Sequence, residues 1–132
     1  AISSFAHQIA RIEAGQTEPT IRVGFLDSRR DLTDVRDTVN AYCGLMASGA
    51  PRTVYNVCSG RGQKIHDVLV GLIDLAHVPI AVELDPSRLR SNDPALVLGD
   101  RSRISRDVGW EPQITLAETL RDILYYWRRK VT

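Results

Sequence analysis

An α/β unit is predicted by residues 54–76, VYNVCSGRGQKIHDVLVGLIDLA. Residues 54–58 are a short β-type run, which the glycine-containing turn at 59–62 stops. Apolar side chains at helical spacing follow this turn, namely Ile65, Val68, Leu69, Leu72, Ile73 and Ala76. A strand, a glycine turn and a helix in succession indicate an α/β protein.

Further helices are predicted by apolar residues that recur every three or four positions. They cover residues 2–12, 35–46 and 116–127, and a short one includes Ile104 and Val108. Short strands are predicted at 21–23 and 80–84, while the arginine-rich segment between strand 21–23 and helix 35–46 is expected to be a polar loop, as are residues 88–93. The apolar stripe of helix 35–46 consists of Val35, Val39, Tyr42 and Met46. The helix has Thr33 or Asp34 as a plausible cap.

The composition favours one folded domain: 132 residues, 43% hydrophobic and 25% charged, with a formal net charge of +1. A nucleic-acid-binding protein usually carries a large basic excess, so nucleic acid is not an expected partner. No apolar run approaches the roughly 20 residues that span a bilayer, and no signal peptide is recognisable. A cytoplasmic location without membrane association is therefore expected. Cys43 and Cys58 lack metal-ligand spacing and are expected to be reduced core thiols.

Two polar stretches combine arginines with carboxylates, at residues 29–37, RRDLTDVRD, and 88–93, RLRSND. A guanidinium group can bind two phosphate oxygens at once and keeps its charge, while a carboxylate can accept from ribose or sugar hydroxyl groups. Such a pair of loops can hold a diphosphate. Solvated surface salt bridges are the alternative explanation for these arginines and carboxylates, and the residue types alone favour it.

Two other motifs match enzyme signatures only in part. Gly60-Arg61-Gly62 lies between a strand and a helix, as in a dinucleotide-binding loop, but Ile65 stands where the third glycine is required. Tyr126 and Lys130 have the Y-x-x-x-K spacing of a short-chain dehydrogenase, but no strand or nucleotide loop accompanies them. A basic helix end is the preferred interpretation.

Metal and hydrolase signatures are also incomplete. The three histidines, His7, His66 and His77, have no metal-ligand spacing, and Ser59 lacks the first glycine of a nucleophile elbow. The sequence therefore predicts no metal site and no catalytic residue within these 132 residues.

The order of several short motifs resembles the C-terminal portion of extended short-chain dehydrogenases/reductases that act on nucleotide sugars. These motifs are SSFA at 3–6, RDL at 30–32, VRD at 35–37, YNVCSG at 55–60, RSND at 90–93, GD at 99–100 and GWEP at 109–112. Residues 25–37, FLDSRRDLTDVRD, are most similar to the GDP-4-keto-6-deoxy-D-mannose reductases and GDP-mannose 4,6-dehydratases. The resemblance implies a GDP-sugar substrate and NAD or NADP as cofactor.

The resemblance also implies roles for four residues. Arg30 matches the arginine of the family's R-D-aromatic motif, which contacts the diphosphate, and Arg90 matches a second phosphate-contacting arginine. Asp93 matches an acidic residue that contacts ribose or base, and Ser4 falls near a nucleotide-contacting segment. The choice among reductase, dehydratase and epimerase stays open.

The family's glycine-rich loop and its catalytic Ser/Thr and Y-x-x-x-K residues precede the matched portion. Residues 1–132 are therefore expected to be the substrate-binding portion, inactive alone, with the dinucleotide-binding domain absent from this chain. In the family, strand 54–58 completes the parallel sheet of that domain, so its exposed edge predicts either a missing portion or a homo-oligomer. The alternative function is a non-catalytic nucleotide-binding or protein-interaction module with the same fold.

Overall fold

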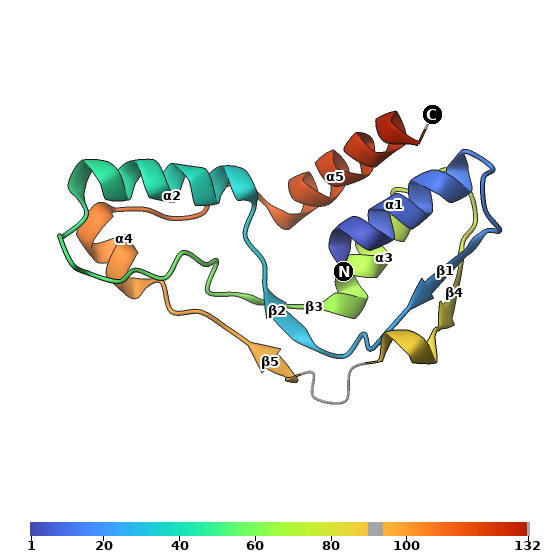
Figure 1. The fold of residues 1–132 in the computed structure, drawn as a ribbon, viewed down its shortest axis with the longest axis horizontal. Helices are drawn as coiled ribbons and strands as arrows, with labels where there is room; N and C mark the ends of the chain where they lie inside the picture. Colours follow the sequence, from blue (N-terminus) through green and yellow to red (C-terminus); the bar gives the residue numbers. More distant parts are fainter. Residues whose placement is uncertain (90–93, 132) are drawn as a thin grey trace. The chain divides into compact units, whose positions relative to one another are not determined.

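The computed structural model describes residues 1–89 and 94–131, whose elements are labelled in Figure 1. The helices are α1 (Ile2–Glu13), α2 (Val35–Ser48), α3 (Ile65–Ile73), the short 3-10 helix η1 (Pro86–Arg88), α4 (Ser102–Val108) and α5 (Leu116–Lys130). The strands are β1 (Thr20–Val23), β2 (Arg29–Asp31), β3 (Gly62–Lys64), β4 (Ala81–Leu84) and β5 (Leu96–Val97). This helix-rich α/β content with few short strands confirms the predicted fold class.

The chain divides into two compact units. The first unit comprises Ala1–Ser28, Lys64–Ala95 and Ala117–Thr132, and the second comprises Arg29–Gln63 and Leu96–Leu116. Each unit combines segments that are distant in the sequence.

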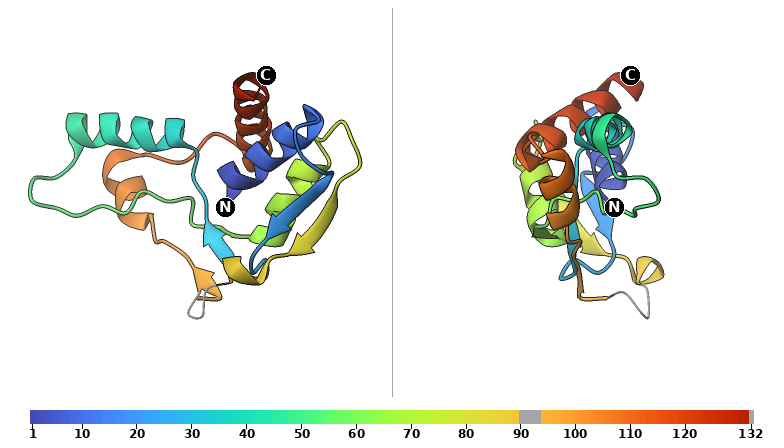
Figure 2. Two further views of the ribbon diagram at one scale, coloured as in Figure 1. Left: turned by 45° about the vertical axis from the view of Figure 1, so that its right-hand side comes forward. Right: turned by 90° about the vertical axis from the view of Figure 1, so that its left-hand side faces the viewer.

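In the first unit, strands β1 and β4 are parallel and adjacent, with Ile21 opposite Val82 (Figure 2). Helices α1 and α3 pack together, and their apolar stripes are buried together with those of β1 and α5. The buried side chains are Phe5, Ala6, Ile9, Ala10, Ile12, Ile21, Val23, Ile65, Val68, Leu69, Leu72, Leu120 and Leu124. This core confirms the apolar periods predicted for these helices.

The second unit contains the parallel pair β2 and β5, within a sheet of order β3-β2-β5. Helix α2 packs against α4 so closely that a Cβ atom at Gly44 would lie 2.9 Å from Val108 Cγ1. Buried Ala41, Ile104 and Trp110 form a small core there. Gly109 ends α4 in the left-handed region at φ 71°, as its position after the helix predicts.

Several predictions of secondary structure were wrong. Residues 54–58 form no strand, because a strand needs a hydrogen-bonded neighbour and no described strand pairs with this segment. The polar stretch 29–31, expected as a loop, is strand β2, because its backbone pairs with β5. The short strands β3 and β5 were not predicted, and α3 ends at Ile73 rather than continuing to Ala76.

The expected burial was also wrong in two places. The stripe of Val35, Val39, Tyr42 and Met46 is exposed, with Met46 90% accessible, although such a stripe normally faces a core. Cys43 is exposed and Cys58 half-buried, so neither is a core thiol, and both are free of disulfides. Within the described residues, no helix combines the length and apolar character needed to cross a membrane.

Candidate functional site

Arg30 lies in the middle of β2, where it pairs in register with Val97 of β5. Its side chain is half-buried, and Nη1 donates a hydrogen bond of 2.9 Å to the carbonyl oxygen of Arg29. A side chain on a paired strand has a more restricted backbone than one on a free loop. The arginine of the predicted R-D motif is therefore presented by a strand of the second unit.

The neighbouring Asp31 carboxylate joins three segments of the second unit. Oδ1 accepts hydrogen bonds from the backbone N–H of Ser59 at 2.7 Å and from its hydroxyl at 2.5 Å. Oδ2 accepts from the backbone N–H groups of Gly60 at 2.9 Å and Gly99 at 3.1 Å. The Asp31 side chain thus connects the end of β2 to the turn at residues 59–62 and to Gly99.

The hydrogen bonds to Asp31 also control its ionisation. Burial disfavours the charged form, but the bonds from Ser59, Gly99 and Gly60 outweigh burial and lower the pKa of the Asp31 carboxyl below its ordinary value. Burial and the nearby Asp31 charge raise the pKa of the Cys58 thiol. Asp31 is therefore a fixed negative charge at neutral pH, beside a protonated thiol.

The turn at residues 59–62 does not fit a dinucleotide. Successive backbone N–H groups beside a glycine in the left-handed region, here Gly60 at φ +72°, can cradle a phosphate. The Ser59 and Gly60 amides instead bind the Asp31 carboxylate. A Cβ atom on Gly62 would meet the Leu96 side chain at 3.1 Å, so this glycine permits packing within the protein. The Ser59 and Gly60 amides are therefore already engaged within the protein.

The same turn is supported on its other side by Arg101. Its Nε donates to the carbonyl oxygen of Ser59 at 3.2 Å, and Nη1 donates to Ser105 Oγ and to Glu111. The position of Ser59 is therefore fixed from two segments, because Asp31 accepts from its N–H group and Arg101 donates to its carbonyl oxygen.

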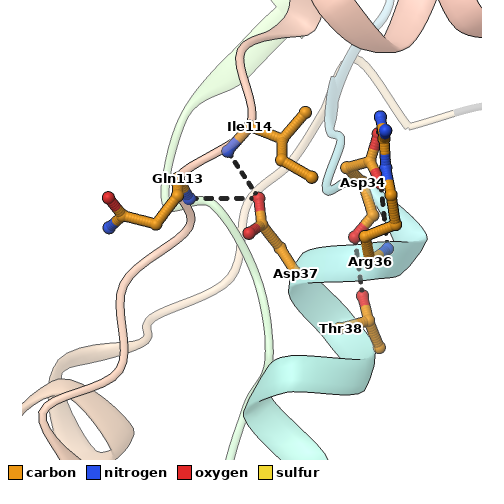
Figure 3. Close-up of polar contacts among 6 residues, drawn as sticks. All are labelled: Asp34, Arg36, Asp37, Thr38, Gln113 and Ile114. Atoms are coloured by element: carbon orange, nitrogen blue, oxygen red, sulfur yellow. Dashed lines mark hydrogen bonds and ion pairs between the residues drawn. The ribbon is translucent and has the colours of Figure 1, made fainter.

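A second group of carboxylates organises helix α2 (Figure 3). Asp34 accepts from the backbone N–H of Arg36 at 2.9 Å, as the predicted N-cap, and also binds the Arg36 guanidinium group. Asp37 is 1% exposed, and its Oδ2 accepts from the backbone N–H groups of Gln113 at 3.1 Å and Ile114 at 2.9 Å. The two bonds to Asp37 hold residues 113–114, which precede α5, against helix α2. They explain why the VRD motif at 35–37 ends in a buried aspartate.

The other predicted site residues belong to the first unit or lie outside the described part of the chain. Ser4 is exposed near the start of α1 in the first unit, and its carbonyl oxygen accepts from Gln8 Nε2. Arg90 and Asp93 lie outside the described residues. Asp31 was not among the predicted site residues, although its place in the R-D motif was the available signal.

The C-terminal Y-x-x-x-K match lies on the last turns of α5. Tyr126 is exposed, and the Lys130 ammonium group lies 5.8 Å from its ring centroid. Arg128 binds Glu13 through two bonds of 2.7 Å and donates to the carbonyl oxygen of Leu75. Arg128 is thus a structural residue of the first unit. Among the described residues, no group of three or more acidic, histidine or cysteine side chains could hold a metal ion.

Comparisons with known proteins place this architecture among nucleotide-sugar reductases, dehydratases and epimerases. The GDP-6-deoxy-D-mannose reductase of Pseudomonas aeruginosa is 40% identical over 130 residues, covering 98% of this chain and 43% of the relative. The solved structure of RMD from Pseudomonas aeruginosa with NADPH matches with a TM-score of 0.91 and 38% identity, again covering 98% of this chain and 43% of that one. A Burkholderia cenocepacia structure matches with a TM-score of 0.82 and 34% identity, covering 95% and 41%.

The family described as GDP-mannose 4,6 dehydratase matches residues 2–123, and the chain belongs to this family. The resemblance inferred from the sequence motifs is thereby confirmed. The chain spans less than half the length of the Pseudomonas aeruginosa reductase.

Proposed function

We propose that this chain is the GDP-sugar-binding portion of an NAD(P)-dependent GDP-4-keto-6-deoxy-mannose reductase or GDP-mannose 4,6-dehydratase. The observation that carries the proposal is the family match over residues 2–123, together with 40% identity to a GDP-6-deoxy-D-mannose reductase. The name of that relative supports a GDP-linked deoxy-mannose as the substrate class, and the family supports a reductase or dehydratase reaction.

In this proposal, Arg30 and Arg90 bind the diphosphate of the nucleotide sugar. Arg30 lies on a paired strand next to Asp31, whose hydrogen bonds to the 59–60 turn fix the backbone that presents the Arg30 guanidinium group. Charge-assisted bonds from guanidinium to phosphate are the strong class of hydrogen bond. Asp93 and Ser4 are proposed to contact the nucleoside part.

The cofactor is proposed to bind mainly to a dinucleotide-binding domain outside residues 1–132. NADPH in the Pseudomonas aeruginosa RMD structure supports a nicotinamide cofactor, and the internal bonds of the Ser59 and Gly60 amides support a cofactor site outside that turn. When bound, the cofactor supplies hydride chemistry. The residues of this chain bind and orient the sugar nucleotide, and the chain alone is expected to be inactive.

The exposed α2 stripe supports the same division of the protein. Val35, Val39, Tyr42 and Met46 form an apolar surface on the second unit, and residue Val54 is also exposed. A parallel sheet is normally covered on both faces, and residues 54–58 have no described strand partner. We propose that the dinucleotide-binding domain covers these residues, and that a chain without it self-associates as a homo-oligomer.

The diphosphate site is tested by calorimetric titration of the chain with GDP and GDP-mannose. Arg30→Ala and Arg90→Ala are each expected to weaken the binding of both ligands by about 1.5–3 kcal/mol, which lowers the affinity roughly tenfold to more than a hundredfold. Arg121→Ala, which removes an exposed arginine of α5, should leave the affinities unchanged. Equal affinities for all variants and the wild type would show that the arginines belong to a solvated surface.

The enzymatic assignment is tested by incubating the purified chain with GDP-mannose or its 4-keto-6-deoxy product and either nicotinamide cofactor. No turnover is expected from this chain alone. Adding the dinucleotide-binding domain should produce activity, and turnover without that addition would contradict the proposed division and return attention to Tyr126 and Lys130.

A further inference from the structure

Four hydrogen bonds converge on the carboxylate of Asp31, the residue that directly follows the proposed diphosphate-binding Arg30. We infer that Asp31 is a positioning residue, whose carboxylate locks β2 onto the 59–60 turn and Gly99 so that Arg30 is held in place for the diphosphate. Successive side chains of a strand point to opposite faces, so Asp31 can fix the strand from one face while Arg30 stands on the other. The inference rests on the proposed diphosphate site.

The geometry requires a carboxylate at this position. Four donors converge on its two oxygens, from Ser59, Gly60 and Gly99, at 2.5–3.1 Å. An asparagine has the same shape, but its amide NH₂ would face N–H donors on one side and lose their bonds. A Cβ atom on Gly99 would lie 2.5 Å from Cys58 Sγ, so the close approach of this backbone depends on a glycine.

Preorganisation and simple electrostatics predict opposite effects of Asp31 on binding. GDP is an anion, so a nearby carboxylate repels it, and neutralising Asp31 should strengthen binding if charge alone mattered. If Asp31 instead holds the Arg30 backbone, its neutralisation releases β2, and binding must then order that segment at a cost. A fall in affinity after removal of this negative charge therefore distinguishes positioning from through-space electrostatics.

Asp37 provides a matched control within the same unit. It is also a carboxylate that accepts two backbone N–H bonds, and Asp37→Asn removes the same charge without changing the side-chain shape. Its partners, Gln113 and Ile114, do not contact β2 through these bonds. A variant there reports on general loss of stability and of charge.

The test is calorimetric titration of the 132-residue chain with GDP, combined with thermal unfolding and amide hydrogen exchange. Asp31→Asn is expected to weaken GDP binding about tenfold and to speed hydrogen exchange at the Ser59, Gly60 and Gly99 amides. The control Asp37→Asn should change the GDP affinity by less than about twofold. Ser59→Ala removes one donor and no charge. It should weaken GDP by about twofold to threefold, and it tests the same contact if Asp31→Asn does not fold.

The outcomes separate this inference from the proposed function. If Arg30→Ala weakens GDP binding but Asp31→Asn and Ser59→Ala do not, the diphosphate site stands and the positioning role is wrong. Equal losses in Asp31→Asn and Asp37→Asn would reduce Asp31 to a general stabilising residue and overturn the inference. If Arg30→Ala binds GDP as the wild type does, or the wild type does not bind, the proposed site fails and the positioning role fails with it.

Discussion

The two units are stabilised in different ways. The first buries apolar faces of α1, α3, α5 and β1 against one another, whereas the second has a small apolar core of Ala41, Ile104 and Trp110. In the second unit, buried or half-buried carboxylates make the defining bonds, Asp31 to the 59–60 turn and Asp37 to Gln113 and Ile114.

This contrast indicates which unit has the larger apolar contribution to its stability. Burying apolar area supplies most of the favourable free energy of folding, at roughly 25 cal/mol per Å². The second unit leaves its most apolar helix stripe, on α2, in solvent. Its hydrogen bonds specify geometry, but each contributes only about 1 kcal/mol net. The second unit should therefore be the less stable one, and the one that gains from a partner surface.

The largest expected effect is in the first core. Leu72 of α3 is fully buried, so Leu72→Ala should lower the free energy of unfolding by about 2–5 kcal/mol through lost burial and a cavity. Val70→Ala on the same helix removes a half-exposed side chain and should cost less than about 1 kcal/mol. Denaturant unfolding of both variants measures the difference. Similar small losses would mean that the first unit is not the well-packed one.

The Glu13–Arg128 ion pair should have a smaller effect on the first unit. The Glu13 carboxylate is 10% exposed and accepts two bonds from Arg128 and one from the His77 backbone N–H. Glu13→Gln should cost about 1.5–3 kcal/mol, because it leaves the half-buried Arg128 guanidinium group without its counter-charge. Glu18→Gln, at an exposed position, is the matched control and should cost less than about 0.5 kcal/mol in the same thermal unfolding measurement.

The pH dependence of stability checks the same pair. Burial opposes ionisation of Glu13, but the bonds from Arg128 and His77 outweigh it and lower its pKa below the ordinary 4.5. Because the folded pKa is the lower one, the stabilisation is fully present above the unfolded pKa and is lost as the pH falls through the folded value. Wild type should therefore lose more stability than Glu13→Gln on acidification. Parallel pH profiles would show that the pair contributes nothing.

The sequence predicted local structure better than long-range pairing. The apolar stripes at 65–76 and at 116–127 correctly predicted helices α3 and α5, because helical bonds and apolar faces are set within a few residues. Strand β2 was missed because its partner β5 lies far along the chain, and residues 54–58 had strand composition without a described neighbour. The role of Asp31 was missed for the same reason, since its donors come from two distant segments.

The α2 stripe offers the sharpest test of the contrast between the units, with the smallest expected effect on stability. The double variant Val39→Lys and Met46→Lys places charges on exposed positions, so the free energy of unfolding should change by less than about 0.5 kcal/mol per site. Self-association, measured by light scattering over a range of concentrations, should nevertheless fall, because contiguous exposed apolar surface drives it. Arg121→Lys with Lys130→Arg is the charge-neutral control on α5 and should associate as the wild type does. A wild-type chain that is monomeric at all concentrations, or a double variant that associates unchanged, would show that the α2 stripe needs no cover and that the second unit is self-sufficient.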